Sequence, residues 1–434
     1  MLLLRTAAIG FVISVCLSGC LGKEASPGTT SDGDASDTSS TKDVAQQQAP
    51  PFKDNCKVDS DCTKASCVVG VCVPMADPAK EVGVLTDPTN DNVPTTDPMQ
   101  LGCVGQTVDD AVKALPKDGK AVMWGRVDRF GGGGVTTDIE VAVFRATDFH
   151  PEACYGLTDD ADIQACYQDD NKVGKPLAKT VSISAQLPSA QAAGLDLVGK
   201  AKEGDDCVLH LDCGAGYECR YEKSVARKIC IETHGIYAVP DVPTNVQLIV
   251  RVHPTKPTSS KWHDGYLWDI VMFSDRLDKK GDGFQPSKYV NQDTYRVNPT
   301  IVGEAQWQLV PTTMGLQEID TGNGVIGGRI RDCGVDGGRG GWAIHNAKIG
   351  LGVKAQGIAF FNDSEDDTVP VKTSSATDLL GRYAAVDIPP GPNRLAASVL
   401  TGGKTVPLGS MDVYVIPNSL TICSLPGRVP VLTK

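Results

Sequence analysis

Two short signatures occur twice in this chain, in the same order, and this internal repeat limits the folds open to it more than any other feature. The first signature is a glycine-containing apolar run, and the second begins Gly-x-Tyr-Ala. Self-similarity of this kind indicates repeated structural units, so we expect two related domains in tandem. The matching pairs are Val122–Val127 with Val325–Ile330, Gly235–Pro243 with Gly381–Pro389 and, more weakly, Asp138–Val141 with Asn346–Ile349.

Copy one is longer than copy two. The offset between equivalent residues falls from 203 at the first signature to 146 at the second, so copy one carries 57 additional residues between them. Segments at about 150–176 and 200–232, which hold six cysteines, account for this surplus. Because loops between strands tolerate added residues, we interpret both segments as insertions into the first domain.

Most of the chain from residue 104 onward is patterned for β-strands. Several apolar runs alternate with polar residues, which is typical of strands with one buried face, and Gly- or Pro-containing turn signals separate them. Only Asp109–Leu115 suggests a short helix. The sequence therefore predicts a mainly β fold of tandem immunoglobulin-like β-sandwiches. The expected strands are Ala121–Val127, Ile139–Phe144, Thr180–Leu187, Val246–Val252, Tyr266–Phe273, Ile349–Val353 and Met411–Ile416.

Copy two contains further motifs that point to a known family. They are the Asn-Ala strand at Asn346–Ile349, the T-D-x-x-G-x-Y stretch Thr377–Tyr383 and the P-P-G turn Pro389–Gly391. Together they resemble the carboxypeptidase regulatory-like family over about 325–400. The resemblance implies a transthyretin-like β-sandwich that stabilises or binds and has no catalytic role of its own. Copy one departs from the pattern, since Thr233–Gly235 lacks the aspartate.

The N-terminus has the layout of a bacterial secretion signal that ends in a lipobox. A basic residue precedes the apolar run Ala7–Val15, which is too short to span a bilayer permanently. Leu17–Cys20 follows, with small residues that permit cleavage before the cysteine. We therefore expect lipidation of Cys20 and anchoring in a bacterial envelope membrane by several acyl chains. Leu21 in place of an aspartate favours the outer over the inner membrane.

Composition divides the chain into tethers and domains. Residues 21–51 are rich in Ser, Thr, Asp, Gly and Pro and lack aromatic residues, so they cannot bury enough apolar surface to fold. The predicted order is signal peptide 1–19, flexible tether 20–52, cysteine-rich mini-domain 53–75, Pro-rich linker 76–103, first sandwich 104–320 with its insertions, and carboxypeptidase regulatory-like second sandwich 321–434.

Fifteen cysteines in an exported chain predict disulfides. Two segments share a C-x5-C opening. In the first, the cysteine spacing and the oxidising compartment favour disulfides over zinc, although the pairing stays open. Cys154 and Cys166 are close enough to pair locally, and a Cys333–Cys423 bridge would tie the ends of the second sandwich. This assignment leaves Cys103 as the odd thiol. The two four-cysteine segments contain Cys56, Cys62, Cys67 and Cys72, and Cys207, Cys213, Cys219 and Cys230.

Charge and motifs exclude several functions. A formal net charge of −12 repels nucleic acid, and no basic run reverses it locally. The six histidines form no zinc-protease motif, and there is no serine-nucleophile elbow. We therefore expect no enzyme, cofactor or metal. Asp275, Asp278 and Asp282 could ligate Ca²⁺, but an acidic solvated turn is the favoured interpretation.

Aromatic residues provide the candidate ligand contacts. Trp262 lies in a polar loop ahead of a strand and is the preferred candidate, with Tyr266 beside it. Trp268 is expected in the core, because both faces of its strand are apolar.

The sequence favours a non-enzymatic, lipid-anchored envelope module that binds or supports an envelope protein or glycan. The alternative is a surface lipoprotein that captures carbohydrate or peptide for uptake or degradation, with Trp262 as the main contact. An unrecognised hydrolase has the least support, because no nucleophile is paired with a base.

Overall fold

The computed structural model describes residues 59–61, 65–68, 71–74 and 99–426, and the predicted signal peptide and tether lie outside the described residues. The described chain is mainly β and forms several sheets, which confirms the expected fold class. Gaps in the last range fall at 105–107, 117, 131–135, 158, 185–186, 196–203, 207–216, 223–226, 233–234, 257–261, 281–284, 334–342, 362–368 and 379.

Sandwich 1 consists of two sheets that enclose an apolar core. One sheet has the strand order β12–β3–β9, and the other contributes β6–β5–β10–β11. Met123, Val141, Val239 and Val250 are fully buried between them. The bounds are β3 Lys120–Arg126, β4 Asp128–Arg129, β5 Ile139–Arg145, β6 Ala178–Val181, β9 Ile236–Pro243, β10 Gln247–Pro254, β11 Trp262–Val271, β12 Thr294–Arg296 and β13 Thr300–Gly303.

Sandwich 2 repeats this arrangement. Strands β20–β14–β17–β16 form one sheet and β15–β18–β19 the other. Their facing side chains, among them Ile326, Leu395 and Val413, are completely buried. The bounds are β14 Gly324–Arg331, β15 Ala347–Leu351, β16 Gly357–Phe360, β17 Arg382–Ile388, β18 Gly391–Thr401, β19 Lys404–Val415 and β20 Ser419–Pro426.

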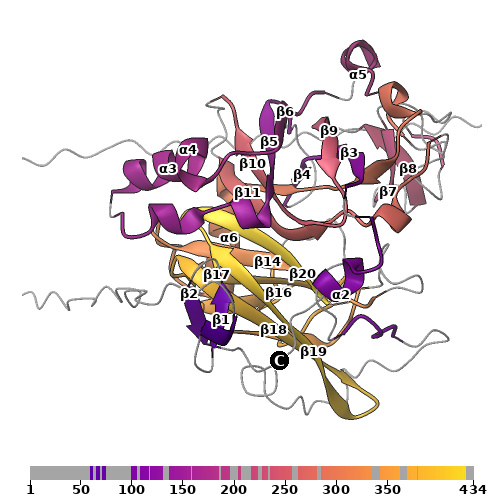
Figure 1. The fold of residues 1–434 in the computed structure, drawn as a ribbon. Coiled ribbons are helices and arrows are strands. Elements are labelled where there is room, and N and C mark those ends of the chain that lie inside the picture. Colours follow the sequence, from indigo (N-terminus) through magenta and orange to yellow (C-terminus); the bar gives the residue numbers. More distant parts are fainter. Residues whose placement is uncertain are drawn as a thin grey trace, which may run out of the picture. The chain divides into compact units, whose positions relative to one another are not determined.

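One ten-stranded sheet runs through both sandwiches (Figure 1). Strand β20 is parallel to β14 on one side and to β11 on the other, where Asp264–Leu267 pairs with Ser419–Ile422. The second sheet of sandwich 1 therefore continues edge to edge into the first sheet of sandwich 2. The strand order is β16–β17–β14–β20–β11–β10–β5–β6, with β13 beside β11 and β4 beside β13. The domain boundary at 320 stays a prediction, and this sheet crosses it.

The repeat is visible in the register of the sheets. In copy two, Gly328 lies opposite Tyr383, and the tyrosine hydroxyl donates to the carbonyl of Cys423 at 3.0 Å. The same carbonyl passes so close to Gly328 that a Cβ there would lie 1.6 Å from its oxygen. Only glycine fits such an approach. The corresponding residues of copy one are Gly125, Tyr237 and Val297, with a hydroxyl–carbonyl distance of 2.7 Å and a Cβ–oxygen distance of 2.0 Å.

Both copies also share a bulge. The β3–β9 pairing shifts register between Ala121 and Met123, and the β14–β17 pairing shifts between Gly324 and Ile326. Asp241 and Asp387 occupy the corresponding positions, and both have left-handed backbone angles, with φ of 58° and 56°. Aspartate tolerates this conformation better than most residues, and the extra residue bends the strand.

In each copy, one side-chain hydroxyl bonds two main-chain groups of a neighbouring segment. Thr377 Oγ1 accepts the N–H of Ala347 at 2.8 Å and donates to the carbonyl of Ile344, also at 2.8 Å. Ser182 makes the same two bonds in copy one, with the main chain of Ile139 (3.0 Å) and Thr136 (2.6 Å). Ser182 is therefore the counterpart of Thr377, although it lies far from Thr233–Gly235 in the sequence.

The helices lie largely in the insertions and connections. The strand expected at Thr180–Leu187 ends at Val181, and Leu187 begins a helix, so that expectation is wrong in its second half. The short helix expected at Asp109–Leu115 is present. The bounds are α2 Val108–Val112, α3 Asp160–Gln168, α4 Asp170–Val173, α5 Leu187–Ala193 and α6 Glu304–Met314.

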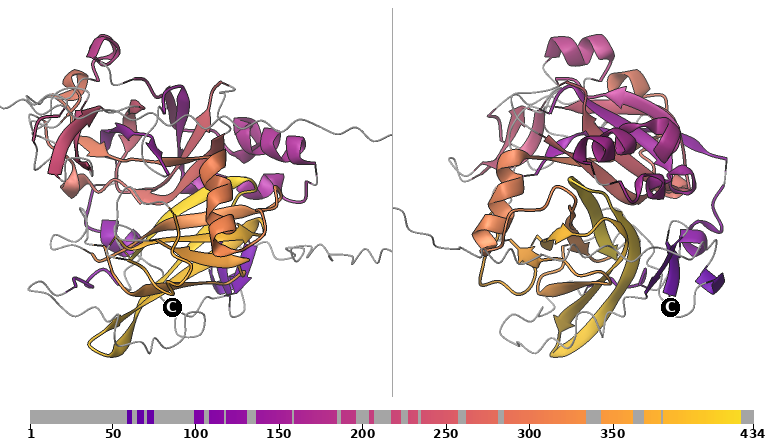
Figure 2. Two further views of the ribbon diagram at one scale, coloured as in Figure 1. Left: turned by 180° about the vertical axis from the view of Figure 1, so that it is seen from behind. Right: turned by 90° about the vertical axis from the view of Figure 1, so that its left-hand side faces the viewer.

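Helix α6 covers one face of the joined sheet. It ends at Gly315, whose φ of 72° provides a left-handed cap. Trp307 and Val310 bury their side chains against strands β14, β16 and β17 (α6 is orange in Figure 2). This burial supplies the tertiary contact that a helix of eleven residues needs in order to persist.

Candidate functional site

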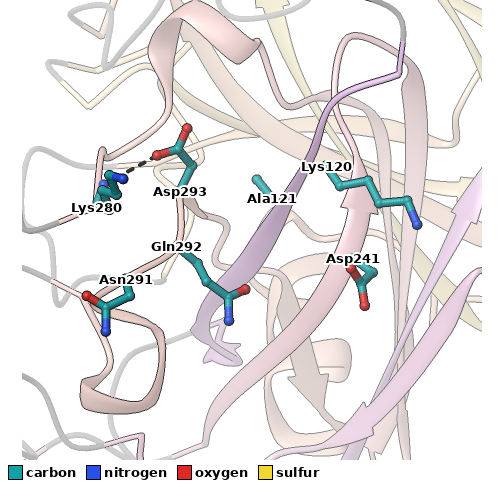
Figure 3. Close-up of a pocket in the computed structure, with 7 residues that line it drawn as sticks. All are labelled: Lys120, Ala121, Asp241, Lys280, Asn291, Gln292 and Asp293. Carbon is teal, nitrogen blue, oxygen red and sulfur yellow. Dashed lines mark hydrogen bonds between the residues drawn. The ribbon is translucent and has the colours of Figure 1, made fainter.

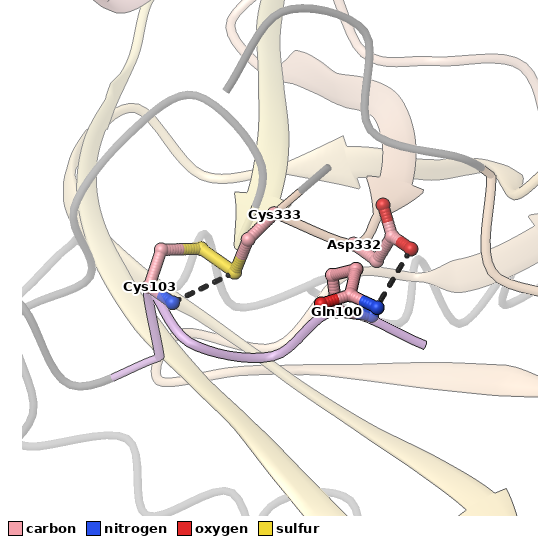
Figure 4. Close-up of a disulfide and its surroundings, with 4 residues drawn as sticks. All are labelled: Gln100, Cys103, Asp332 and Cys333. Carbon is pink, nitrogen blue, oxygen red and sulfur yellow. Dashed lines mark hydrogen bonds between the residues drawn. A yellow bond between two sulfur atoms is a disulfide. The ribbon is translucent and has the colours of Figure 1, made fainter. Parts of the chain in front are cut away.

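A disulfide joins the chain ahead of sandwich 1 to sandwich 2. Cys103 bonds Cys333, with a Cα–Cα distance of 5.6 Å (Figure 4). The N–H of Gln100 donates to Asp332 Oδ2 at 3.2 Å, and the N–H of Cys333 donates to the carbonyl of Gln100 at 2.7 Å. The predicted pairing of Cys333 with Cys423 and the assignment of Cys103 as the odd thiol are therefore wrong. Cys333 follows the end of β14, whereas Cys423 lies within β20.

Cys423 is a free, buried thiol. Its side chain lies 3.4 Å from the hydroxyl of Tyr383, inside sandwich 2. Burial raises the pKa of the Cys423 thiol to about 12, because the thiolate would lose its hydration. The reactive thiolate is therefore scarce at neutral pH, and this residue has a packing role.

The first insertion of copy one is stapled and anchored. Cys154 bonds Cys166, the pairing expected from their separation in sequence, and the link holds α3 to the preceding turn. The fully buried guanidinium of Arg251 on β10 reaches this insertion, with Asp170 Oδ1 at 2.9 Å and the carbonyl of Tyr167 at 3.1 Å. Glu140 on β5 lies 3.0 Å from the same group. Because the guanidinium is buried whereas both carboxylates are partly exposed, loss of a carboxylate would leave a buried charge with fewer partners.

The two four-cysteine segments contain similar hairpins. Strands β1 (Ala65–Val68) and β2 (Val71–Pro74) place Cys67 opposite Cys72, and β7 (Tyr217–Glu222) and β8 (Arg227–Glu232) place Cys219 opposite Cys230. Cys230 is disulfide-bonded. The other cysteines of these segments, together with the predicted lipidation site, lie outside the described residues, namely Cys20, Cys56, Cys62, Cys207 and Cys213.

The aromatic ligand candidates are engaged by the protein itself. Trp262 is the first residue of β11 rather than part of a loop, and its ring packs on the sandwich 1 core beneath Arg129, whose Cζ lies 5.5 Å from the ring centroid. Tyr266 is completely buried, which removes it from any surface that a ligand could reach. Trp268 is a core residue, as expected. The described residues therefore offer no open aromatic platform at this position.

A polar cluster lies where the two sandwiches meet. His263 on β11 stacks on Trp307 of α6, with ring centroids 4.1 Å apart. Its Nδ1 lies 2.8 Å from Asn418 Oδ1, at the start of β20, and its Nε2 lies 3.3 Å from Glu304. Burial lowers the pKa of His263 despite the neighbouring carboxylate, so the ring is neutral at pH 7. The cluster connects β11 with α6 and with the residue before β20, across the junction of the two sandwiches.

Metal chemistry finds no support in the described chain. No group of three or more His, Cys, Asp or Glu side chains there is arranged to hold an ion. Asp275 and Asp278 lie near the surface, and Asp282 falls outside the described residues. Among the described helices, none is long and apolar enough to cross a membrane.

Comparisons with known proteins leave the family open. No family model and no curated protein matches the chain. Among solved structures, the shaft pilin SpaA from Lactobacillus rhamnosus GG aligns over 71% of this chain and 97% of its own, at 10% identity and a TM-score of 0.16. A streptococcal ancillary pilin aligns over 71% and 68%, at 11% identity and a TM-score of 0.15. Similarities this weak carry no argument about fold or function.

Proposed function

We propose that this chain is a non-enzymatic, lipid-anchored module of the bacterial envelope, in which the two sandwiches form one rigid structural and binding unit. The observation that carries the proposal is the shared sheet, in which β20 bonds β14 and β11 at once. Rotation of one sandwich against the other would break main-chain hydrogen bonds and expose the buried junction around His263.

The polar clusters support a non-catalytic role. Arg251 joins an insertion to the sheet, His263 joins the sandwiches, and Cys423 is buried and protonated. Each of these groups is occupied by contacts within the chain. An envelope protein or glycan is the proposed partner, and Cys20 carries the proposed lipid anchor, more suited to the outer than to the inner membrane.

Calorimetry tests the rigid unit. If the shared sheet couples the sandwiches, the full-length protein should unfold in one transition whose van't Hoff and calorimetric enthalpies agree. A variant with Cys103→Ser and Cys333→Ser should still show one transition, at lower temperature, because the sheet remains. Two separate transitions in both proteins would show that the sandwiches are independent and would refute the proposal.

Metabolic labelling tests the anchor. Cells that express the full-length protein should incorporate an alkyne-tagged fatty acid into it, and Cys20→Ala should abolish the label and release the protein from membranes. Cys16→Ala is the matched control, because it removes a neighbouring cysteine of the same signal region and should keep the label. Label that persists in Cys20→Ala would exclude this anchoring site.

A further inference from the structure

An open pocket of about 410 Å³ lies where β3 and β9 meet the segment that leads into β12 (Figure 3). Lys120 and Ala121 begin β3, Asp241 occupies the bulge of β9, and Lys280 and 291–293 come from the neighbouring loops. Within the described chain, no hydrogen bond or ion pair engages the side chains of five of these polar residues. They are Lys120, Asp241, Lys280, Asn291 and Gln292.

The internal repeat identifies the residues of sandwich 2 that correspond to the residues of this pocket. By the register that pairs Gly125 with Gly328, the counterparts of Lys120, Asp241 and Gln292 are Asn323, Asp387 and Asn418. The side chains of all three counterparts make hydrogen bonds, whereas those of the three pocket residues make none in the described chain.

In sandwich 2 a peptide segment fills the equivalent position. Asp387 Oδ1 accepts the main-chain N–H of Asp320 at 2.9 Å and the side-chain amide of Asn323 at 2.9 Å. The N–H of Asn418 donates to the carbonyl of Asn323 at 2.7 Å. The bulge carboxylate therefore accepts a main-chain N–H from the connection that leads into β14. Asp241 has the same left-handed backbone, but no residue in the described part of the chain donates to its carboxylate.

We propose that this pocket of sandwich 1 binds an acidic peptide segment, whose main-chain N–H bonds Asp241 as the N–H of Asp320 bonds Asp387. The proposal deepens, and rests on, the binding-module function above. The partner is thus a protein with an exposed acidic stretch, and not a neutral glycan.

Charge favours an acidic segment. The segment that fills the equivalent place in sandwich 2 carries two carboxylates, Glu318 and Asp320. In sandwich 1 the position of Asn323 is taken by Lys120, and Lys280 adds a second amine without an ion-pair partner in the described chain. The remaining acid, Asp293, is already bonded to Lys279 Nζ at 3.1 Å. The pocket lining therefore carries two unpaired amines and one unpaired carboxylate, and an acidic ligand balances this excess of positive charge.

The pocket also suits a peptide in shape and polarity. Its volume fits a short segment of a few residues. The amides of Asn291 and Gln292 can each donate and accept, which matches the paired N–H and C=O groups of an extended main chain. Ala121, the apolar lining residue, leaves room close to the backbone of β3.

Saturation-transfer NMR with the full-length protein in detergent tests the proposal. The probe is an acetylated, amidated heptapeptide with the sequence of residues 316–322, LQEIDTG, which contains the segment that fills the sandwich 2 position. One control peptide replaces its Glu and Asp with Gln and Asn, and a second carries an N-methyl group on the Asp nitrogen. Saturable binding of the first peptide, with at least fivefold weaker binding of both controls, is the expected result.

Variants locate the site. Asp241→Gly keeps the left-handed backbone and should weaken binding at least tenfold, and Lys120→Gln with Lys280→Gln should weaken it at least fivefold. The exposed pair Lys228→Gln with Lys404→Gln is the matched control for net charge and should stay within twofold. Absence of saturable binding, equal binding of the neutral peptide, or equal effects of both lysine pairs would overturn the proposal. Lipidation and the single unfolding transition would be unaffected by any of these results.

Discussion

Replacement of Asp269 by asparagine should stabilise the protein at neutral pH and have no effect near pH 4. Asp269 lies in β11 with only 4% of its surface exposed, and its carboxyl accepts a hydrogen bond from the Gln247 side chain. The pKa of Asp269 is raised to about 8, mainly by burial, with the Gln247 hydrogen bond opposing the shift and the nearby Asp412 adding to it. The folded protein therefore retains a proton that the unfolded chain releases.

The size of the effect follows from the two pKa values. Above the ordinary value of 3.8, the unfolded chain ionises while the folded chain stays protonated up to about pH 8. The free energy of unfolding falls by about 1.4 kcal/mol per pH unit across this window, or about 4 kcal/mol at pH 7. Asparagine carries no charge, keeps an acceptor for Gln247 and tolerates the φ of 59° at this position. Asp269→Asn should therefore recover most of the free energy of unfolding that the parent protein loses between pH 4 and pH 7.

Urea unfolding at pH 4, 5, 6, 7 and 8 measures this difference. The gap between Asp269→Asn and the parent protein should be near zero at pH 4 and widen steadily to pH 8. Asp275→Asn is the matched control, because that side chain is 55% exposed and should change stability little. Parallel stability curves, or a destabilised Asp269→Asn at pH 7, would show that burial does not hold the proton on Asp269.

The remaining predictions concern the repeat and the cysteines. Gly328→Ala should cost about 3 kcal/mol or more by urea unfolding, because its Cβ would meet the Cys423 carbonyl at 1.6 Å. Tyr383→Phe should cost about 1–2 kcal/mol in the same assay, since it leaves that buried carbonyl without the hydroxyl donor. Cys103→Ser with Cys333→Ser should lower stability by about 2–5 kcal/mol, because the bridge closes a loop across 230 residues; an unchanged melting temperature would contradict this. Cys423 should resist iodoacetamide in the folded protein and react fully in urea, as mass spectrometry would show.

The sequence was sufficient for features that depend on local pattern. The apolar run Ala121–Val127 located β3, its repeat at Val325–Ile330 located β14, and the repeated Gly-x-Tyr-Ala stretch marked two strands that occupy the same register. Helix α6 was not predicted from the sequence. It contains Pro311, and proline is unfavourable in a helix interior. Burial of Trp307 and Val310 outweighs that local preference.

Features that depend on distant partners could not be predicted. Ser182 replaces a threonine across an insertion of about fifty residues, and no local signal relates it to Thr377. The pairing of β20 with β11 joins two sheet edges whose strands look ordinary by themselves. The bridge of Cys103 to Cys333 follows from that long-range packing, so proximity in sequence gave the wrong partner. The open carboxylate of Asp241 becomes informative only beside its bonded counterpart Asp387.

The position of β20 sets the order in which the protein can fold. Among the strands of the two sandwiches β20 is synthesised last, yet it lies beside β14 and also closes the edge of β11. Sandwich 1 therefore carries an open strand edge until the chain beyond residue 419 has emerged, and unpaired edges invite association with other chains. The shared sheet can be completed only late and through contacts between residues distant in sequence, which slows folding. A nascent chain of this kind needs protection until β20 has been synthesised, and truncations that remove β20 should aggregate rather than leave a stable first sandwich.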